Sequence, residues 1–220
     1  MNTTRLAPAY RLIAELFLYP EDRDADRIET ELARLVEAPP TLRAPLEAFL
    51  AAPAAINAEE YVATLELAPP VPLYFGSYLY KEPTSCRGAG MSGRNAYMLE
   101  LANIYRHFGV ELEGGEMADF VPVVVEFLAI SLEREEADQI GLRRYLVETL
   151  LIEATDKLLA ALRKCESPYA YLAVALRAAL AEDSARMADG PKWRPRPCDE
   201  PPHAALRAGD FMGPETGAEL

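Results

Sequence analysis

Apolar residues recur at every third or fourth position along most of the chain, a spacing that predicts helices rather than strands. In the first such segment, Leu6, Tyr10, Ile13 and Phe17 share one helical face, and Pro20 ends the pattern. The same spacing continues in later segments separated by proline, glycine and cap residues: 28–36, 42–49, 57–67, 94–108, 119–132, 135–164 and 168–187. Alternation of β-branched residues is nearly absent. We therefore expect an all-α fold, a single globular bundle of roughly eight helices.

Cap and turn residues predict where several of these helices begin and end. Asn57, followed three residues later by a glutamate, is typical of a capping box that opens a helix. Gly109 stands where a C′ glycine would close the 94–108 helix. Asp119 is placed to cap the next helix, with Pro122 in its first turn, where proline is tolerated. In the long 135–164 segment, Gly141 marks a predicted break.

The last part of the chain differs in composition from the rest. Residues 188–220 carry six of the 18 prolines and four of the 12 glycines, with little apolar periodicity. We therefore expect a helical domain over 1–187 and a proline- and glycine-rich tail over 188–220 that lies outside the fold. If the tail does pack back, Trp193, the single tryptophan, is the obvious anchor.

The net charge of the protein limits which classes of molecule it can bind. With 22 Lys and Arg against 35 Asp and Glu, the net charge is −13, so the field of the protein repels phosphate backbones. We expect no nucleic-acid partner, whereas a positively charged peptide would be attracted. No apolar run approaches the roughly 20 residues that cross a bilayer, and Arg11 and Glu15 interrupt the N-terminal apolar stretch that a secretion signal would need. We therefore expect a cytoplasmic protein without a membrane span, and a monomer.

A glycine-rich segment, 88–93, spells the GxGxxG pattern of dinucleotide-binding proteins. That fingerprint works only inside a parallel βαβ unit, which the rest of the pattern does not provide, so we interpret the segment as a surface loop. Arg87 could lower the pKa of the neighbouring Cys86 thiol, but no His or second Cys lies nearby in the sequence to form a reactive pair with it. Three separated cysteines and two histidines give no zinc-ligand spacing, so we expect no cofactor and no catalytic machinery.

The segment from Glu116 to Glu133 holds the most informative pattern. As a helix it would be apolar nearly all round, which is typical of a central core helix, except for one stripe of mixed character. The stripe consists of Asp119, Val123, Glu126, Ile130 and Glu133. Such a stripe could accept an amphipathic peptide that carries Arg or Lys. Alternatively, Asp119 is a plain N-cap and Glu126 pairs with an internal arginine, and both interpretations can hold together.

At this segment the chain resembles the assembly chaperones of respiratory nitrate reductase, the delta subunit or NarJ family, within the redox-enzyme maturation chaperones that include TorD and DmsD. The resemblance covers roughly residues 1–185 and rests on Arg94, Met98, Leu101, Tyr105, Gly109, Glu116, Asp119, Pro122, Glu126 and Phe127. Tyr61 resembles the tyrosine that starts the family's Y-x-x-L-F segment. Ala118 stands where the family usually has Pro, which is a minor departure. Phe120 stands where the family has His, so a role of that histidine in peptide or nucleotide contacts does not carry over, and this departure suggests a subgroup that serves a different reductase or dehydrogenase.

The resemblance implies an all-helical, non-catalytic chaperone that binds the N-terminal leader of a molybdopterin oxidoreductase catalytic subunit and supports insertion of the molybdenum cofactor. The residues expected to contact that peptide are Asp119, Glu126, Glu116, Phe120, Val123, Tyr61, Arg94 and Tyr105. Two other functions stay open: a small helical enzyme or nucleotide-binding protein that uses the 86–94 loop, and a permanent structural subunit of the client enzyme.

We predict that the glycine-rich loop binds no dinucleotide, because no βαβ unit surrounds it. Equilibrium dialysis against NAD, FAD and GTP at millimolar concentration checks this and should show no saturable uptake. Saturable micromolar binding that disappears in Gly90→Val would contradict the prediction and favour the nucleotide-binding alternative.

Overall fold

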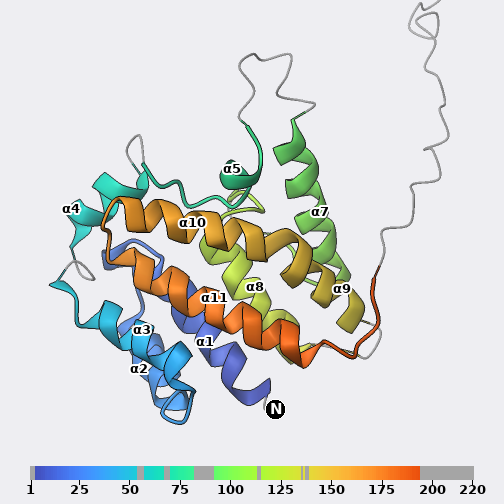
Figure 1. Cartoon of the computed structure of the whole chain (residues 1–220), viewed down its shortest axis with the longest axis horizontal. Helices are drawn as coiled ribbons and strands as arrows, with labels where there is room; N and C mark the ends of the chain where they lie inside the picture. Colours follow the sequence, from blue (N-terminus) through green and yellow to red (C-terminus); the bar gives the residue numbers. More distant parts are fainter. Residues whose placement is uncertain are drawn as a thin grey trace, which may run out of the picture.

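The computed structural model describes residues 3–53, 57–66, 70–81, 92–112, 115–134, 136 and 139–193. Within these ranges the chain is helical, and an isolated bridge between Tyr74 and Phe120 is the one β pairing. The elements shown in Figure 1 are α1 (Thr3–Leu16), η1 (Pro20–Asp22), α2 (Ala25–Arg34), α3 (Pro40–Leu50), α4 (Ala58–Tyr61), η3 (Val62–Glu66), α5 (Gly76–Leu79), α7 (Gly93–His107), α8 (Val121–Glu133), α9 (Ile140–Tyr145), η4 (Leu146–Leu151), α10 (Ile152–Lys164) and α11 (Tyr169–Arg186). The all-α prediction is confirmed.

The centre of the bundle is the pair α1 and α8. Helix α1 packs most extensively on α8 and also touches α2 and α11, while α11 packs between α3 and α10. In Figure 1, α10 and α11 run side by side across one side of the molecule, with α1 and α8 behind them. Small side chains at Ala7, Ala9 and Ala14, all buried, let neighbouring helices approach α1 closely. Because apolar residues surround most of both helices, each is buried on several sides.

A buried charged network ties four helices together. Arg143 of α9 and Asp183 of α11 form an ion pair in which both side chains are fully buried. Arg143 also donates to the carbonyl of Leu128 at 3.0 Å and to the hydroxyl of Ser131, both in α8. The hydroxyl of Tyr10 in α1 donates to Asp183 at 3.1 Å, and burial raises its pKa well above the usual value, so it stays protonated as a donor.

Two of the predicted helix boundaries are confirmed and one is wrong. The side chain of Asn57 accepts hydrogen bonds from the backbone at the start of α4, and Gly109 follows α7 with a left-handed φ of +68°. Asp119, however, does not cap α8. The helix begins at Val121 with Phe120 in the N-cap position and no side-chain cap bond. Since Asp119 is turned inward and paired, its carboxylate cannot reach the first turn of the helix.

Gly141 is not a break inside a longer helix. It is the second residue of α9, which begins at Ile140 and not at 135, and which continues through the π-helical η4 into α10. Glycine fits there because the chain after α11 crosses it: a Cβ atom would lie 3.1 Å from the carbonyl oxygen of Pro191 and 3.3 Å from the backbone nitrogen of Trp193. The ring of Trp193 packs on Tyr145 with centroids 4.7 Å apart. Residues 188–193 therefore pack on the bundle, past the predicted domain boundary at 187, and the rest of the predicted tail lies outside the described residues.

We predict that the packing of residues 188–193 leaves no room for a side chain at position 141. In a chain ending at Met187, Gly141→Ala should stabilise the protein by up to about 0.5 kcal/mol, because Gly141 lies in the first turn of α9, where alanine gains less over glycine than the roughly 1 kcal/mol of a helix interior. In a chain ending at Trp193, the added methyl group crowds Pro191, so the gain should be smaller or reversed. Denaturant unfolding of the four proteins measures both effects. An equal gain in the two chain lengths would contradict the packing of this segment on α9.

Candidate functional site

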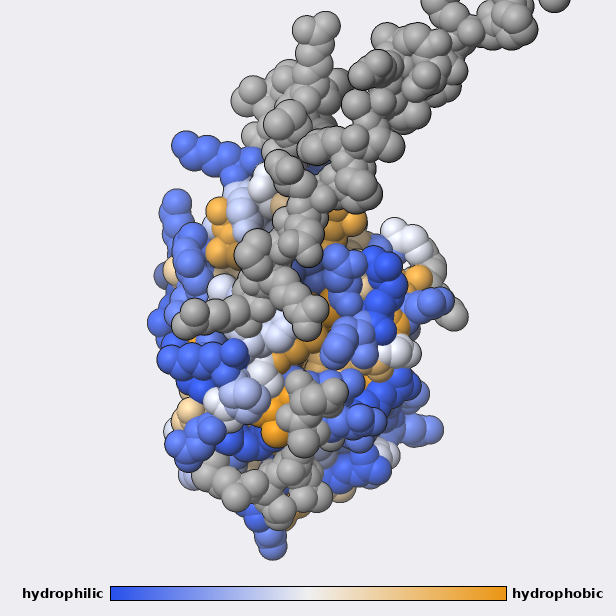
Figure 2. All heavy atoms as spheres, turned by 90° about the vertical axis from the view of Figure 1, so that its right-hand side faces the viewer, coloured by the Kyte–Doolittle hydropathy of each residue, from blue (hydrophilic) through white to orange (hydrophobic). Residues whose placement is uncertain are grey.

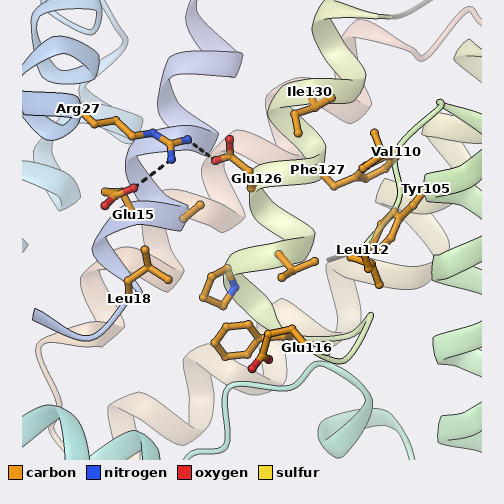
Figure 3. A pocket seen from close by; sticks show the side chains of 14 residues that line it. Glu15, Leu18, Arg27, Tyr105, Val110, Leu112, Glu116, Glu126, Phe127 and Ile130 are labelled. Carbon is orange, nitrogen blue, oxygen red and sulfur yellow. Dashed lines mark hydrogen bonds and ion pairs between the residues drawn. The ribbon is translucent and has the colours of Figure 1, made fainter. Parts of the chain in front are cut away.

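A pocket of about 350 Å³ opens beside α8, between the C-terminal half of α1 and the loop that joins α7 to α8. Figure 3 shows the side chains around it. They are Ala14, Glu15, Leu18, Arg27, Tyr105, Val110, Leu112, Glu116, Phe120, Pro122, Val123, Glu126, Phe127 and Ile130. We call this pocket the α8 groove.

Helix α8 supplies the floor of the α8 groove. Pro122 lies in its first turn, and Val123, Glu126 and Ile130 follow at helical spacing on the side that faces the groove. These three side chains are only partly buried, whereas most of the rest of α8 is buried in the core. The middle of the mixed stripe expected from the sequence, Val123, Glu126 and Ile130, is thus a part of α8 that core packing leaves uncovered, whereas its first member, Asp119, precedes the helix and is buried. Its last member, Glu133, lies beyond the groove and pairs with Arg11 of α1.

Apolar side chains form most of the two walls. Ala14 and Leu18 lie on the α1 side, and Val110 and Leu112 lie on the loop side. On the face shown in Figure 2, hydrophilic side chains cover most of the described surface, and hydrophobic ones form small separate patches. Single exposed apolar residues need no explanation, but Leu112 and Met117, 37% and 47% exposed, come from the same loop that borders the groove.

Acidic side chains border this apolar floor. Arg27 of α2 donates to Glu15 at 3.1 Å and to Glu126 at 2.6 Å, as the dashed lines in Figure 3 show. Glu116 lies at the other end of the groove and is exposed. The lining residues thus include three carboxylates and one guanidinium, so the groove is apolar with a net negative charge. Such a surface attracts a ligand that combines apolar and cationic side chains.

Asp119 anchors the rim of the groove and does not line it. Its side chain is fully buried and accepts from Arg94 Nε at 2.8 Å and from the backbone N–H of Gly76 at 3.1 Å. Its carbonyl oxygen accepts from Phe75 N–H at 2.9 Å. A Cβ atom at position 76 would lie 2.5 Å from the Asp119 carboxylate, so only glycine allows this approach. The expectation that Asp119 and Arg94 contact a peptide therefore conflicts with their placement: they hold α5 and α7 to the start of α8.

Tyr105 and Phe120 do lie at the groove. The hydroxyl of Tyr105 donates to the carbonyl of Ala118 at 2.7 Å, and its ring packs on Phe127 with centroids 4.4 Å apart. Burial raises the pKa of Tyr105 well above its ordinary value, so the phenol stays protonated and keeps this bond. Phe120 is half-buried and packs on Tyr74 at 5.4 Å between ring centroids. Both rings shape the apolar part of the groove, with Tyr105 almost wholly buried beneath it.

Tyr61 lies elsewhere. It is 3% exposed, donates its hydroxyl to the carbonyl of Phe17 at 3.2 Å and packs against Tyr19 and Tyr169. It is not among the residues that line the α8 groove. Its position supports the C-terminal end of α1, so a direct peptide contact by Tyr61 conflicts with the structure.

Sequence reasoning missed the wall that α1 and α2 provide. Glu15 and Arg27 were not among the predicted site residues, although both line the groove. One signal was present: Glu15 is an acidic residue inside a strongly apolar helical segment, and a buried carboxylate there needs a partner. The partner could not be read from local spacing, because Arg27 lies 12 positions from Glu15 on a different helix, and Glu126, which shares Arg27, lies 99 positions from it.

The residues that could support other functions are mostly outside the described part of the chain. Residues 88–91 of the glycine-rich segment, with Cys86 and Arg87, lie outside the described residues, as does His203. Within the described ranges, no cluster of three or more His, Cys, Asp or Glu side chains could hold a metal ion. The same ranges contain no helix long and apolar enough to cross a bilayer.

Residues 23–175 match the family model described as nitrate reductase delta subunit. The chain belongs to the nitrate reductase delta subunit family. A search of curated proteins gave no match. The part that matches the delta subunit family model includes Arg27, the α7–α8 loop and the whole of α8, and therefore most of the groove. The α1 wall, with Ala14, Glu15 and Leu18, precedes the matched residues.

We predict that Asp119→Asn lowers the free energy of unfolding, because Asp119 anchors α5 and α7 to the start of α8 and does not line the groove. It removes the charge that accepts the Arg94 bond in a buried site, which should cost about 1–3 kcal/mol. Asp156→Asn is the matched control, because it alters an Asp–Arg ion pair whose two side chains are 52% and 35% exposed, and should cost less than about 1 kcal/mol. Thermal and urea unfolding measure both. If the two variants unfold alike, the anchoring role of Asp119 is wrong.

Proposed function

We propose that this protein is an assembly chaperone for a molybdopterin oxidoreductase, a nitrate reductase or a related reductase or dehydrogenase. In this role it binds the N-terminal leader of the catalytic subunit and keeps that subunit open until the molybdenum cofactor is inserted. Membership of the delta subunit family supports the assembly role. The chaperone would contribute binding and no chemical step, so we propose that it is not an enzyme.

The observation that carries this proposal is the composition of the α8 groove. A leader that forms an amphipathic helix presents apolar anchors on one face with Arg or Lys beside them. Such a helix needs an apolar groove flanked by opposite charge. Val123, Phe120 and Ile130 would receive the apolar anchors, and Glu116 and Glu126 would face the basic side chains. Tyr105 would act from beneath, by holding the groove in shape.

The proposal differs from the one drawn from sequence alone in the residues that make contact. In this proposal, Asp119, Arg94 and Tyr61 support the groove or the core and make no direct contact with the peptide. Glu126 pairs with an internal arginine and also lines the groove, which supports a role for it in both the pair and the proposed peptide contact.

The test is calorimetric titration with a synthetic N-terminal peptide of the nitrate reductase catalytic subunit from the source organism. Val123→Arg should weaken binding at least about tenfold, because it fills the groove and repels a cationic peptide. Val174→Arg is the matched control, since Val174 is another partly buried helical valine that lines a different surface pocket. It should bind like the parent protein.

Two results would count against the proposal. Absence of peptide binding to the parent protein would remove leader recognition as its function. Equal binding by Val123→Arg and Val174→Arg, with both proteins folded by circular dichroism, would place the peptide on another surface.

A further inference from the structure

Arg27 occupies the edge of the α8 groove, where a ligand's basic side chain would otherwise sit. Its Nη1 donates to Glu15 Oε2 at 3.1 Å, and its Nη2 donates to Glu126 Oε2 at 2.6 Å. One guanidinium is therefore shared between two carboxylates from different helices, as Figure 3 shows. The acidic site in the groove is already occupied by a cation from the protein itself.

The two carboxylates depend on Arg27 to different degrees. The Glu15 side chain is 4% exposed, and its other oxygen accepts from the backbone N–H of Asp24 at 2.7 Å. It therefore keeps one good hydrogen bond if Arg27 moves away. The Glu126 side chain is 32% exposed and accepts no other hydrogen bond from the described part of the chain. Glu126 is the carboxylate that a ligand can reach and that would need a new partner.

Arg27 can leave without unfolding its helix. Helix α2 is capped by Asp24, whose side chain accepts from the backbone N–H of Arg27, and this bond does not involve the guanidinium. The Arg27 side chain is 34% exposed, so its head can turn into water. The Arg27–Glu126 pair, with side chains 34% and 32% exposed, is usually worth little, because water and salt compete with it, and breaking it does not require Arg27 to leave the buried Glu15. A ligand's charge with an apolar anchor beside it can outweigh such a pair.

We propose that Arg27 is an internal competitor of the client's basic side chain, which displaces it from Glu126 on binding. This inference rests on the proposed function and names the residue that sets its specificity. A second cation beside Glu126 would be repelled by the Arg27 guanidinium, and Arg27 can relieve this repulsion because Glu15 and water remain available to it. The excess of carboxylates among the lining residues favours a cationic ligand over an anionic one that would bind Arg27 directly.

The test compares Arg27→Gln with Arg11→Gln. Arg11 also forms an ion pair with a glutamate of α8, Glu133, but it does not line the groove. The probes are the catalytic-subunit leader peptide and the same peptide with every Arg and Lys replaced by Gln. Arg27→Gln should bind the native peptide about three- to tenfold more tightly than the parent does, and the neutral peptide no more tightly. Arg11→Gln should match the parent with both peptides.

Two further variants guard against an effect on folding. Arg27→Lys keeps a positive charge at the site but has a single nitrogen in place of the forked head, so it should tighten binding less than Arg27→Gln. Glu126→Gln should remove most of the difference between the native and the neutral peptide. Thermal midpoints of all variants identify any protein that is not folded.

The outcomes separate this inference from the proposed function. Native-peptide binding that is unchanged or weakened by Arg27→Gln overturns the competitor role and leaves leader recognition intact. Tightening of both peptides shows a steric block and also overturns it. No binding by any of the proteins overturns leader recognition, and the competitor role with it. Tighter binding on removal of residues 194–220, or a dimer that the peptide dissociates, would make the C-terminal segment or a second copy the competitor instead.

Discussion

The buried pair of Arg143 and Asp183 is the interaction on which the arrangement of the bundle depends. Two unpaired charges in that position would cost far more than the protein could offset, so α9 and α11 are fixed relative to each other wherever the pair forms. The bonds from Arg143 to Ser131 and from Tyr10 to Asp183 extend this constraint to α8 and α1. The α8 groove opens along the seam of these two helices, so its shape follows from packing that lies on the opposite side of α8.

The fold could be read from the sequence because it is encoded by local periodicity. Helical spacing of apolar residues, a side-chain cap at Asn57 and a left-handed glycine at Gly109 each act within a few positions. The floor of the groove was predictable for the same reason. Glu126 and Glu133 interrupt a largely apolar helix on one face, and Val123 and Ile130 lie on that same face, where core packing leaves α8 partly uncovered.

The remaining features depend on contacts between distant segments, which periodicity does not encode. Asp119 has the residue type and position of an N-cap, yet the close approach of Gly76 and Arg94 draws its carboxylate inward. Gly141 looks like a helix breaker, but the segment that follows α11 crosses the helix there. In both cases the local preference is a modest term, about 1 kcal/mol, that long-range packing outweighs. The ion pair of Arg27 with Glu126 is likewise a contact between distant segments, and local periodicity does not encode it.

A groove that is apolar and acidic faces a problem of selectivity in a cell, where many unfolded segments carry both apolar and basic residues. High affinity for the right partner does not solve this problem. Selectivity requires a difference between the affinity for that partner and the affinity for other segments. In the proposed role, Arg27 would lower the affinity for every basic ligand, and only a segment that brings a well-placed cation together with matching apolar anchors would regain the loss. Because each ligand would have to remove Arg27 from Glu126, weak and purely electrostatic contacts would be released quickly. In a protein with a net charge of −13, whose long-range field already attracts cations, selectivity of this kind has to come from the site itself.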